Sequence, residues 1–149
     1  MKLNGMDISA SALTAQRLRM DVIASNIANA DVTRGKLVNG KWVPYQRKMV
    51  VMEPKQMGAT FGAQLHKAMN NQTEEGVKIS KIIGDRTPFK KVYNPTHPDA
   101  DEEGYVLMSN VDPLKEMVDM ISASRSYEAN VTALNASKAM YVKALEIGK

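Results

Sequence analysis

Apolar positions form two matching ladders, one near each end of the chain. Successive members are three or four residues apart, and a mean step of 3.5 keeps one stripe of a helix facing a partner helix. The pattern therefore predicts a helix at each end and a stem in which the two helices pack for assembly. The members are Met6, Ala10, Leu13, Arg17, Met20, Ala24 and Ile27, and then Met117, Met120, Ser124, Tyr127, Val131, Leu134, Lys138, Tyr141 and Leu145.

Local signals set the expected ends of these helices. Asp7 or Ser9 is a candidate N-cap for the first helix, which we expect to end near Ala30 because a turn-forming run follows. The last helix is expected to begin at Asp112, an N-cap followed by proline at the first helical position, and to reach about Ile147.

The N-terminal helix carries a second apolar strip and several polar interruptions. Ala15, Leu18 and Val22 lie about half a turn from the first ladder, so this helix needs neighbours on two sides. Polar residues at a helical seam set register and partner choice at some cost in stability. We assign that role to Asn26, Asn29, Asn130 and Asn135.

The middle of the chain predicts short strands. Asn39-Gly40 lies between two short apolar runs, which is the strongest local hairpin signal. β-branched and alternating residues predict further extended segments, and a run rich in Gln, Asn, Gly and Ala predicts a mobile loop at about 55–75. The expected extended segments are 45–53, 76–83, 88–93 and 104–108.

The predicted fold class is α+β, with long terminal helices packed as a coiled-coil stem and a small β-rich middle insert. The stem is expected to be discontinuous, comprising residues 1–35 and 109–149, and the insert to comprise residues 36–108.

Composition narrows the range of functions that the chain can have. The chain has no cysteine among 149 residues, which excludes disulfides and thiolate sites. Neither a secretory signal nor a run of about 20 apolar residues is present, so we expect no cleavable signal peptide and no stable membrane insertion. Residues 34–98 hold twelve basic and four acidic groups, whereas residues 99–149 hold five basic and nine acidic ones. This asymmetry can steer subunits together.

The sequence offers no convincing catalytic, metal or cofactor site. The acidic run 99–104 imitates the start of a calcium-binding loop, but Asn110 stands where a bidentate Glu belongs, and a solvated turn fits better. His66 and His97 are too dissimilar in setting to suggest a zinc site. Nucleophile-elbow, phosphate-loop and dinucleotide motifs are all missing. We therefore expect no enzyme and no cofactor.

Basic pairs beside aromatic residues would suit a nucleic-acid surface. Arg47-Lys48 and Lys90-Lys91 neighbour Tyr45, Phe89 and Tyr93. However, the N-terminal helix is neutral and the C-terminal helix is acidic, so neither predicted helix could read a groove. We expect no nucleic-acid partner.

Both ends of the chain resemble the bacterial flagellar rod and hook protein family. The N-terminal stretches are Ala10–Arg17 and Val22–Asn29, followed by Thr33, and the C-terminal stretches are Asn110–Asp112, Glu116–Ile121, Arg125–Asn130 and Leu134-Asn135. The run 97–106 is more similar to the proximal rod members than to other relatives. The resemblance covers residues 6–54 and 76–149.

This resemblance implies a structural subunit of the proximal rod of the flagellar basal body, exported through the flagellar type III apparatus without a cleavable signal. It implies that the terminal helices polymerise into a hollow drive shaft that transmits torque. The implied partners are copies of itself, other proximal and distal rod proteins, and the rod-to-export-gate adaptor. The expected assembly interface comprises Leu13, Met20, Asn26, Ile27, Asn29, Thr33, Met117, Ile121, Tyr127, Asn130, Val131, Leu134, Asn135, Tyr141 and Leu145.

One alternative from a different class stays open at this point. The same ladders would suit a cytosolic coiled-coil scaffold or adaptor that forms a closed oligomer. Such a protein would have fully helical termini in isolation and a discrete oligomeric state.

Overall fold

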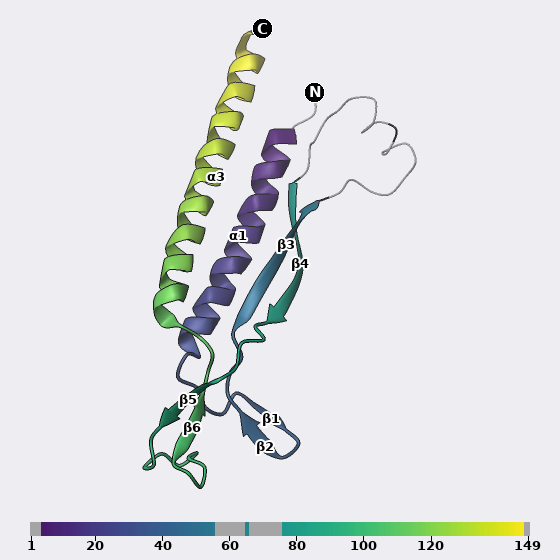
Figure 1. Ribbon diagram of the computed structural model, residues 1–149. Helices are drawn as coiled ribbons and strands as arrows, with labels where there is room; N and C mark the ends of the chain where they lie inside the picture. Colours follow the sequence, from purple (N-terminus) through teal and green to yellow (C-terminus); the bar gives the residue numbers. More distant parts are fainter. Residues whose placement is uncertain (1–3, 56–64, 66–75, 148–149) are drawn as a thin grey trace. The chain divides into compact units, whose positions relative to one another are not determined.

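The structure is a computed structural model that describes residues 4–55, 65 and 76–147 (Figure 1). It contains two long helices and three two-stranded sheets within these residues, so the α+β class is confirmed. Coiled-coil packing of the helices is not confirmed. The loop expected at about 55–75 lies almost wholly outside the described residues.

The first helix, α1, spans Asn4–Ala28. It begins before both candidate caps, so the expected N-cap at Asp7 or Ser9 is wrong. Asp7 instead lies in the first turn, where a carboxylate is stabilised by the helix dipole. The helix ends two residues before Ala30, and Asn29 closes it by donating from Nδ2 to the carbonyl of Ser25 at 2.7 Å.

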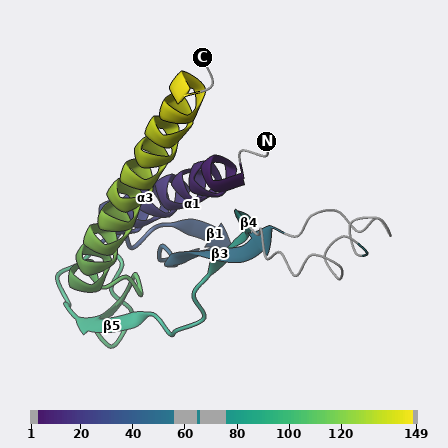
Figure 2. The same cartoon turned by 90° about the horizontal axis from the view of Figure 1, so that it is seen from above.

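The last helix, α3, spans Pro113–Ile147 and agrees with its predicted bounds. Asp112 Oδ1 accepts a hydrogen bond from the Leu114 backbone N–H at 3.1 Å, which confirms the aspartate as the N-cap. Proline lacks a backbone N–H, but no hydrogen bond is lost at the first helical position, because an N–H there has no partner within the helix. Figures 1 and 2 show α3 as one uninterrupted helix.

Strands β1 (Lys36–Val38) and β2 (Lys41–Val43) form the predicted hairpin, with Leu37 opposite Trp42. Its turn residues both have positive φ, 51° at Asn39 and 79° at Gly40. This is the backbone shape that Asn-Gly favours, because it matches the twist of two short antiparallel strands.

Strand β3 (Lys48–Lys55) pairs with β4 (Gly76–Gly84), and Figure 1 shows their arrows running in opposite directions. The expected strand at 45–53 begins three residues late, because the backbone N–H groups before Lys48 bond elsewhere. Tyr45 N donates to the Val32 carbonyl at 3.3 Å, and Arg47 N donates to Asn110 Oδ1 at 2.7 Å.

Strands β5 (Lys90–Tyr93) and β6 (Tyr105–Met108) pair antiparallel, with Val92 opposite Val106. Both were expected as short extended segments. Their pairing was not expected, because the eleven residues between them form a loop too irregular to predict from turn signals.

Contacts divide the chain into two compact units. The first comprises Met1–Leu18, Val51–Lys81 and Ala123–Lys149, and the second comprises Arg19–Val50 and Ile82–Ser122. In the first unit, Ser11 Oγ accepts a hydrogen bond from Val77 N at 3.0 Å and so joins α1 to β4. Ala15 and Ala123 are the buried apolar residues of this unit among those described.

The second unit has a largely polar centre. Val22, Ile23, Ala30, Val106 and Val111 are its buried apolar residues among those described. Three of the four largest fully buried side chains in the described chain also belong to it and are polar: Glu116, Asn26 and Ser109. Polar groups at such sites must be hydrogen-bonded to be tolerated.

Candidate assembly surfaces

Glu116 lies at the centre of the second unit with none of its side chain exposed. Its Oε2 accepts a hydrogen bond from Asn26 Nδ2 at 2.9 Å, and its Oε1 accepts one from Arg47 Nε at 2.7 Å. The first bond joins α1 to the first turns of α3, and the second joins α3 to the segment before β3. A buried carboxylate is therefore fully compensated by partners from two other elements.

The Arg47 guanidinium forms ion pairs with three carboxylates. Its nitrogens lie 2.6 Å from a carboxylate oxygen of Glu116, 3.4 Å from one of Asp85 and 3.5 Å from one of Asp119. Burial on its own lowers the pKa of Arg47, but hydrogen bonds and attraction from Glu116 and Asp85 outweigh it and raise the pKa above its ordinary value. The guanidinium is thus committed to carboxylates within its own subunit rather than presented to an external phosphate.

Asn26 uses both ends of its amide. Nδ2 donates to the Lys48 carbonyl at 2.9 Å as well as to Glu116, while Oδ1 accepts from Lys48 N at 2.9 Å and from the Tyr45 hydroxyl at 3.1 Å. These bonds attach α1 to the start of β3 as a neighbouring strand would. Asn26 is only 1% exposed.

Asn110 completes the set from the loop before α3. Its Oδ1 accepts from Arg47 N, and its Nδ2 donates to the Thr87 carbonyl at 3.1 Å. Hydrogen bonding from the Thr87 backbone N–H lowers the pKa of Asp85, and Arg47 acts in the same direction. We call Asn26, Arg47, Asp85, Asn110 and Glu116 the Glu116 network.

Of the network, only Asn26 was expected as an assembly residue. Glu116 and Asn110 lie inside stretches that carried the family resemblance, but nothing in their local pattern marks them as buried. The sequence pattern linked Arg47 only to a nucleic-acid surface.

A second polar link holds the turn after α1. Asp99 Oδ2 accepts from Thr33 Oγ1 at 2.9 Å, and Asp99 Oδ1 accepts from Arg34. The hydrogen bond from Arg34, followed by the one from Thr33, lowers the pKa of Asp99. Thr33, one of the expected interface residues, therefore bonds within its own subunit.

The other expected residues of α1 are partly covered. Leu13, Met20 and Ile27 are half-buried, as is Asn29 just after the helix, whereas the buried residues of α1 include Ala15 and Val22 from the second apolar strip. Leu13 belongs to the first unit and Met20 and Ile27 to the second. The second apolar strip is thus buried more deeply within the subunit than the predicted ladder.

The expected residues of α3 separate into two groups. Tyr127, Asn130, Val131, Leu134 and Tyr141 are half-buried, at spacings close to the predicted ladder. The second group is exposed. It comprises Asn135, Met117 (52% exposed), Ile121 (56%) and Leu145 (74%). The ladder thus describes the partly covered face of α3 in its central turns but not at either end.

The beginning of α3 presents an exposed apolar stripe on the second unit. Leu114, Met117, Val118 and Ile121 recur at the helical spacing of three and four residues, and each is more than half exposed. Glu116, within the same turns, is wholly buried. Because Glu116 is held inward by Arg47 and Asn26, the stripe is held outward.

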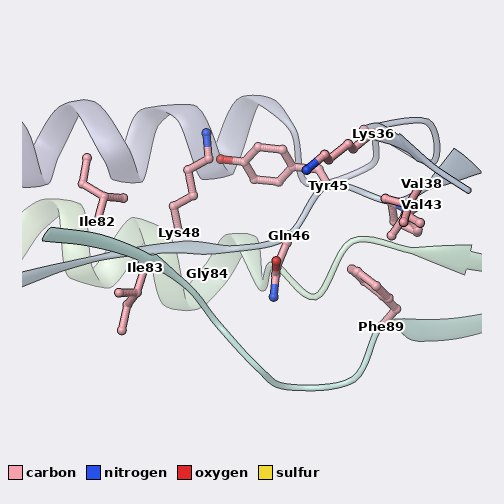
Figure 3. A pocket seen from close by; sticks show the side chains of 12 residues that line it. Lys36, Val38, Val43, Tyr45, Gln46, Lys48, Ile82, Ile83, Gly84 and Phe89 are labelled. Atoms are coloured by element: carbon pink, nitrogen blue, oxygen red, sulfur yellow. The ribbon is translucent and has the colours of Figure 1, made fainter.

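A pocket of about 570 Å³ lies in the second unit between the β1–β2 hairpin and the end of β4 (Figure 3). Lys48 Nζ lies 5.4 Å from the centroid of the Tyr45 ring at this site. We call it the basic pocket; its apolar lining residues are Val38, Val43, Pro44, Ile82, Ile83 and Phe89, and Lys36 and Lys48 supply its positive charge.

Neither a membrane span nor a metal cluster occurs among the described residues. No helix in this part of the chain is both long and apolar enough to cross a membrane. No three His, Cys, Asp or Glu side chains in the same ranges are grouped to hold a metal ion. The acidic run from Asp99 is instead a hydrogen-bonded turn, in which Asp101 Oδ1 accepts from Tyr105 N at 2.8 Å.

Two family models match this chain. The model of the flagella basal body rod protein family matches residues 6–35, and the model of the C-terminal region of flagellar basal body rod FlgEFG proteins matches residues 102–147. These segments contain most of the stretches on which the sequence resemblance rested. They also contain Asn26 and Glu116, which bond to each other across the two matched segments.

Curated relatives match along the whole chain. The flagellar basal-body rod protein FlgC of Bacillus subtilis is 59% identical over 148 residues, covering 98% of this chain and 97% of that protein. The FlgC proteins of Escherichia coli O6:H1 and Borreliella burgdorferi are 46% and 40% identical, and the aligned segments cover at least 95% of each chain.

Proposed function

The chain belongs to the FlgC family of flagellar basal-body rod proteins and is a structural subunit of the rod, and we propose that its two terminal helices carry the assembly. The predicted resemblance to the rod family is thereby confirmed. Association with other rod components and with copies of itself follows from membership in a rod.

One observation supports assembly through the helices above all others. Large apolar side chains are left exposed near both ends of α3 in the single subunit, from Leu114 at 71% to Ile121 at 56% and again from Met140 at 66% to Ile147 at 85%. Exposed apolar side chains grouped in this way are suited to contacts with neighbouring molecules. In a rod, different surfaces of successive subunits contact one another, so each subunit has such neighbours.

In this proposal, residues 1–35 and 109–149 form the assembly stem and residues 36–108 the outer insert. The stems pack into a hollow shaft in the proximal rod, which passes torque outward. The Glu116 network supports it, because its hydrogen bonds join α1, the start of β3 and α3 into one unit. A mechanical load on one of the two helices is thereby passed to the other helix and to β3.

The proposed partners are other proximal and distal rod proteins, the adaptor between rod and export gate, and further copies of the chain. The subunit reaches the rod, outside the cytoplasmic membrane, through the flagellar type III apparatus and without a cleavable signal peptide. We assign it no catalytic activity, since membership in a structural rod family accounts for the chain along its whole length. We likewise assign it no nucleic-acid partner, in keeping with the commitment of Arg47 to carboxylates.

The test replaces Leu134 with aspartate. Leu134 is half-buried on the ladder face of α3, and a carboxylate there cannot be buried against an apolar neighbour without a large cost. We expect Leu134→Asp to abolish incorporation into basal bodies and swimming motility while expression stays normal. Both are measured by immunoblotting of purified basal bodies and by a motility assay in cells lacking the native gene.

The matched control is Ala136→Asp, which adds the same charge at an exposed position about 200° round the helix from Leu134. It is expected to incorporate and to support swimming. Normal swimming by the Leu134→Asp strain at normal expression would contradict the assignment of this face to assembly. Failure of both variants would show that α3 is covered all round.

A further inference from the structure

The loop that joins β5 to β6 is a tightly hydrogen-bonded, acidic projection of the second unit. Asn94 N donates to the Gly104 carbonyl at 2.9 Å, and Asp101 N donates to the Tyr105 carbonyl at 2.9 Å. The Asp101 carboxylate in turn accepts from the backbone N–H groups of Glu103 and Tyr105. A loop held by so many internal bonds is preorganised, so little conformational entropy is lost when it binds.

The end of this loop combines negative charge with aromatic surface. Glu102 and Glu103 are exposed, and neither is in an ion pair within the part of the chain that the structure describes. Beside them, the rings of Tyr93 and Tyr105 form an edge-to-face pair with centroids 5.4 Å apart, and the two residues are 65% and 41% exposed. We call Tyr93, Glu102, Glu103 and Tyr105 the acidic tip.

The basic pocket is complementary to the acidic tip in both charge and polarity. Its lining is mainly aliphatic, with Phe89 as an aromatic wall, and Lys36 and Lys48 supply ammonium groups (Figure 3). A volume of about 570 Å³ has room for a tyrosine ring. The carboxylates of Glu102 and Glu103 would then lie near the two lysines. Such charge pairs fix how two subunits are aligned more than they add to the affinity between them.

The chain cannot place its own acidic tip in its own basic pocket in this conformation. Phe89, which lines the pocket, immediately precedes β5, whereas Tyr93 lies at the far end of that strand. At about 3.3 Å per residue, the extended strand keeps the two sites roughly 13 Å apart. A contact between the tip and the pocket would therefore need two copies of the chain.

We propose that the acidic tip of one copy of this chain docks into the basic pocket of a neighbouring copy in the rod. The proposal rests on the rod-subunit function above and names surfaces of the insert for a contact between copies. Because the two surfaces differ, the contact is heterologous, which is the kind of contact that can repeat along a filament. The contact is small, so it forms when the stems already hold the copies at high local concentration.

The test exploits the absence of native cysteine. Cells are made to produce two single-cysteine versions together, Lys36→Cys and Glu102→Cys, and their basal bodies are isolated and oxidised. A disulfide between the two versions has to be intermolecular. We expect a covalent dimer on a non-reducing gel that neither version gives when produced alone. Mass spectrometry is expected to identify the peptide pair joined between positions 36 and 102.

The matched control pairs Lys36→Cys with Asp31→Cys, which also removes one exposed carboxylate. A dimer as abundant in this control as in the test pair would overturn the proposal. So would the absence of a disulfide between positions 36 and 102 from basal bodies that contain both versions. The presence of the chain in these basal bodies is scored separately by immunoblotting and reports on the rod function alone.

A second measurement needs no substitution. Carbodiimide treatment of basal bodies with the native chain joins a carboxylate directly to an ammonium group in contact with it. We expect a dimer that contains an amide between Lys36 or Lys48 and Glu102 or Glu103. Crosslinks from Glu102 and Glu103 that lead only to a different protein would assign the tip to that protein and reject the contact between copies.

Discussion

A single buried carboxylate explains much of the second unit at the scale of residues. Glu116 is fully buried on a helix whose neighbouring side chains are exposed, and it has a charged partner in Arg47 and a neutral one in Asn26. Burying an ion pair is costly unless each remaining hydrogen-bonding group is satisfied. Here the pairing sets the orientation of α3, since turning the helix would break both bonds.

Replacement of Glu116 by glutamine is expected to destabilise the subunit strongly. The change leaves Arg47 with reduced compensation at the centre of the unit and sets an amide N–H₂ against donors. Breaking a buried pair from one side costs roughly 3 kcal/mol or more. The free energy of unfolding, measured by urea titration of the purified chain, is expected to fall by about that amount.

Glu128→Gln serves as the control, because Glu128 is exposed on the same helix. It is expected to change the free energy of unfolding by less than about 0.5 kcal/mol. Equal effects of the two substitutions would mean that the Arg47–Glu116 bond does not hold the second unit together.

At the scale of elements, side chains on loops connect pieces that have no strand pairing between them. The turn after α1 is held to the β5–β6 loop through Asp99, which accepts from Thr33 and Arg34. Gly35 allows the same turn to lie close to the segment before β3, because a Cβ there would be 2.6 Å from the Tyr45 backbone nitrogen. These links give the insert a defined shape despite its short strands.

The hydrogen bonds to Asp99 predict that the stability of the folded chain depends on pH in the acid range. Since hydrogen bonding from Arg34 and Thr33 lowers the pKa of Asp99 in the folded chain, its contribution to stability is complete above the pKa of an unfolded aspartate, about 3.9. That contribution is lost as the pH falls through the lower native value. The difference in urea midpoint between the native chain and Asp99→Asn is expected to be largest at neutral pH and to shrink below about pH 4.

An NMR titration of the Asp99 carboxyl carbon would measure the native pKa directly. A midpoint at or above that of a free aspartate would contradict the expectation. So would a difference between the two proteins that stays constant with pH.

At the scale of the whole molecule, burial is uneven along the two helices. The Glu116 network anchors α1 and α3 within the second unit. From Lys138 to Ile147, by contrast, every side chain of α3 except that of Tyr141 is exposed. The subunit therefore has one part stabilised by its own contacts and another whose apolar surface is left for other molecules.

Hydrogen exchange of the purified subunit is expected to show this gradient. Amides in residues 114–122 and 19–28 should be protected, since opening these parts of the helices breaks the network, whereas amides after Lys138 should exchange faster. In assembled rods, protection is expected to extend to the end of α3. Equal protection along the whole helix in the isolated subunit would indicate a self-sufficient bundle instead.

Local chemistry made the principal elements of this protein predictable from its sequence. Asp112 and the proline after it set the start of α3, Asn39-Gly40 sets the hairpin turn, and period-two or β-branched segments mark the strands. Each of these depends on residues close together in the chain, so their physical cause can be recognised without the fold. Family membership was predictable in the same way, from short motifs in and beside the two helical segments.

Which side chains meet was determined by tertiary packing instead. Glu116 bonds to Asn26 across 90 residues and to Arg47 across 69, and β5 pairs with β6 across an eleven-residue loop. A glutamate on an amphipathic helix ordinarily faces water, and burial reverses that preference only when a cation and an amide arrive from distant segments. That convergence is a property of three-dimensional packing, so no local pattern in the sequence could have revealed it.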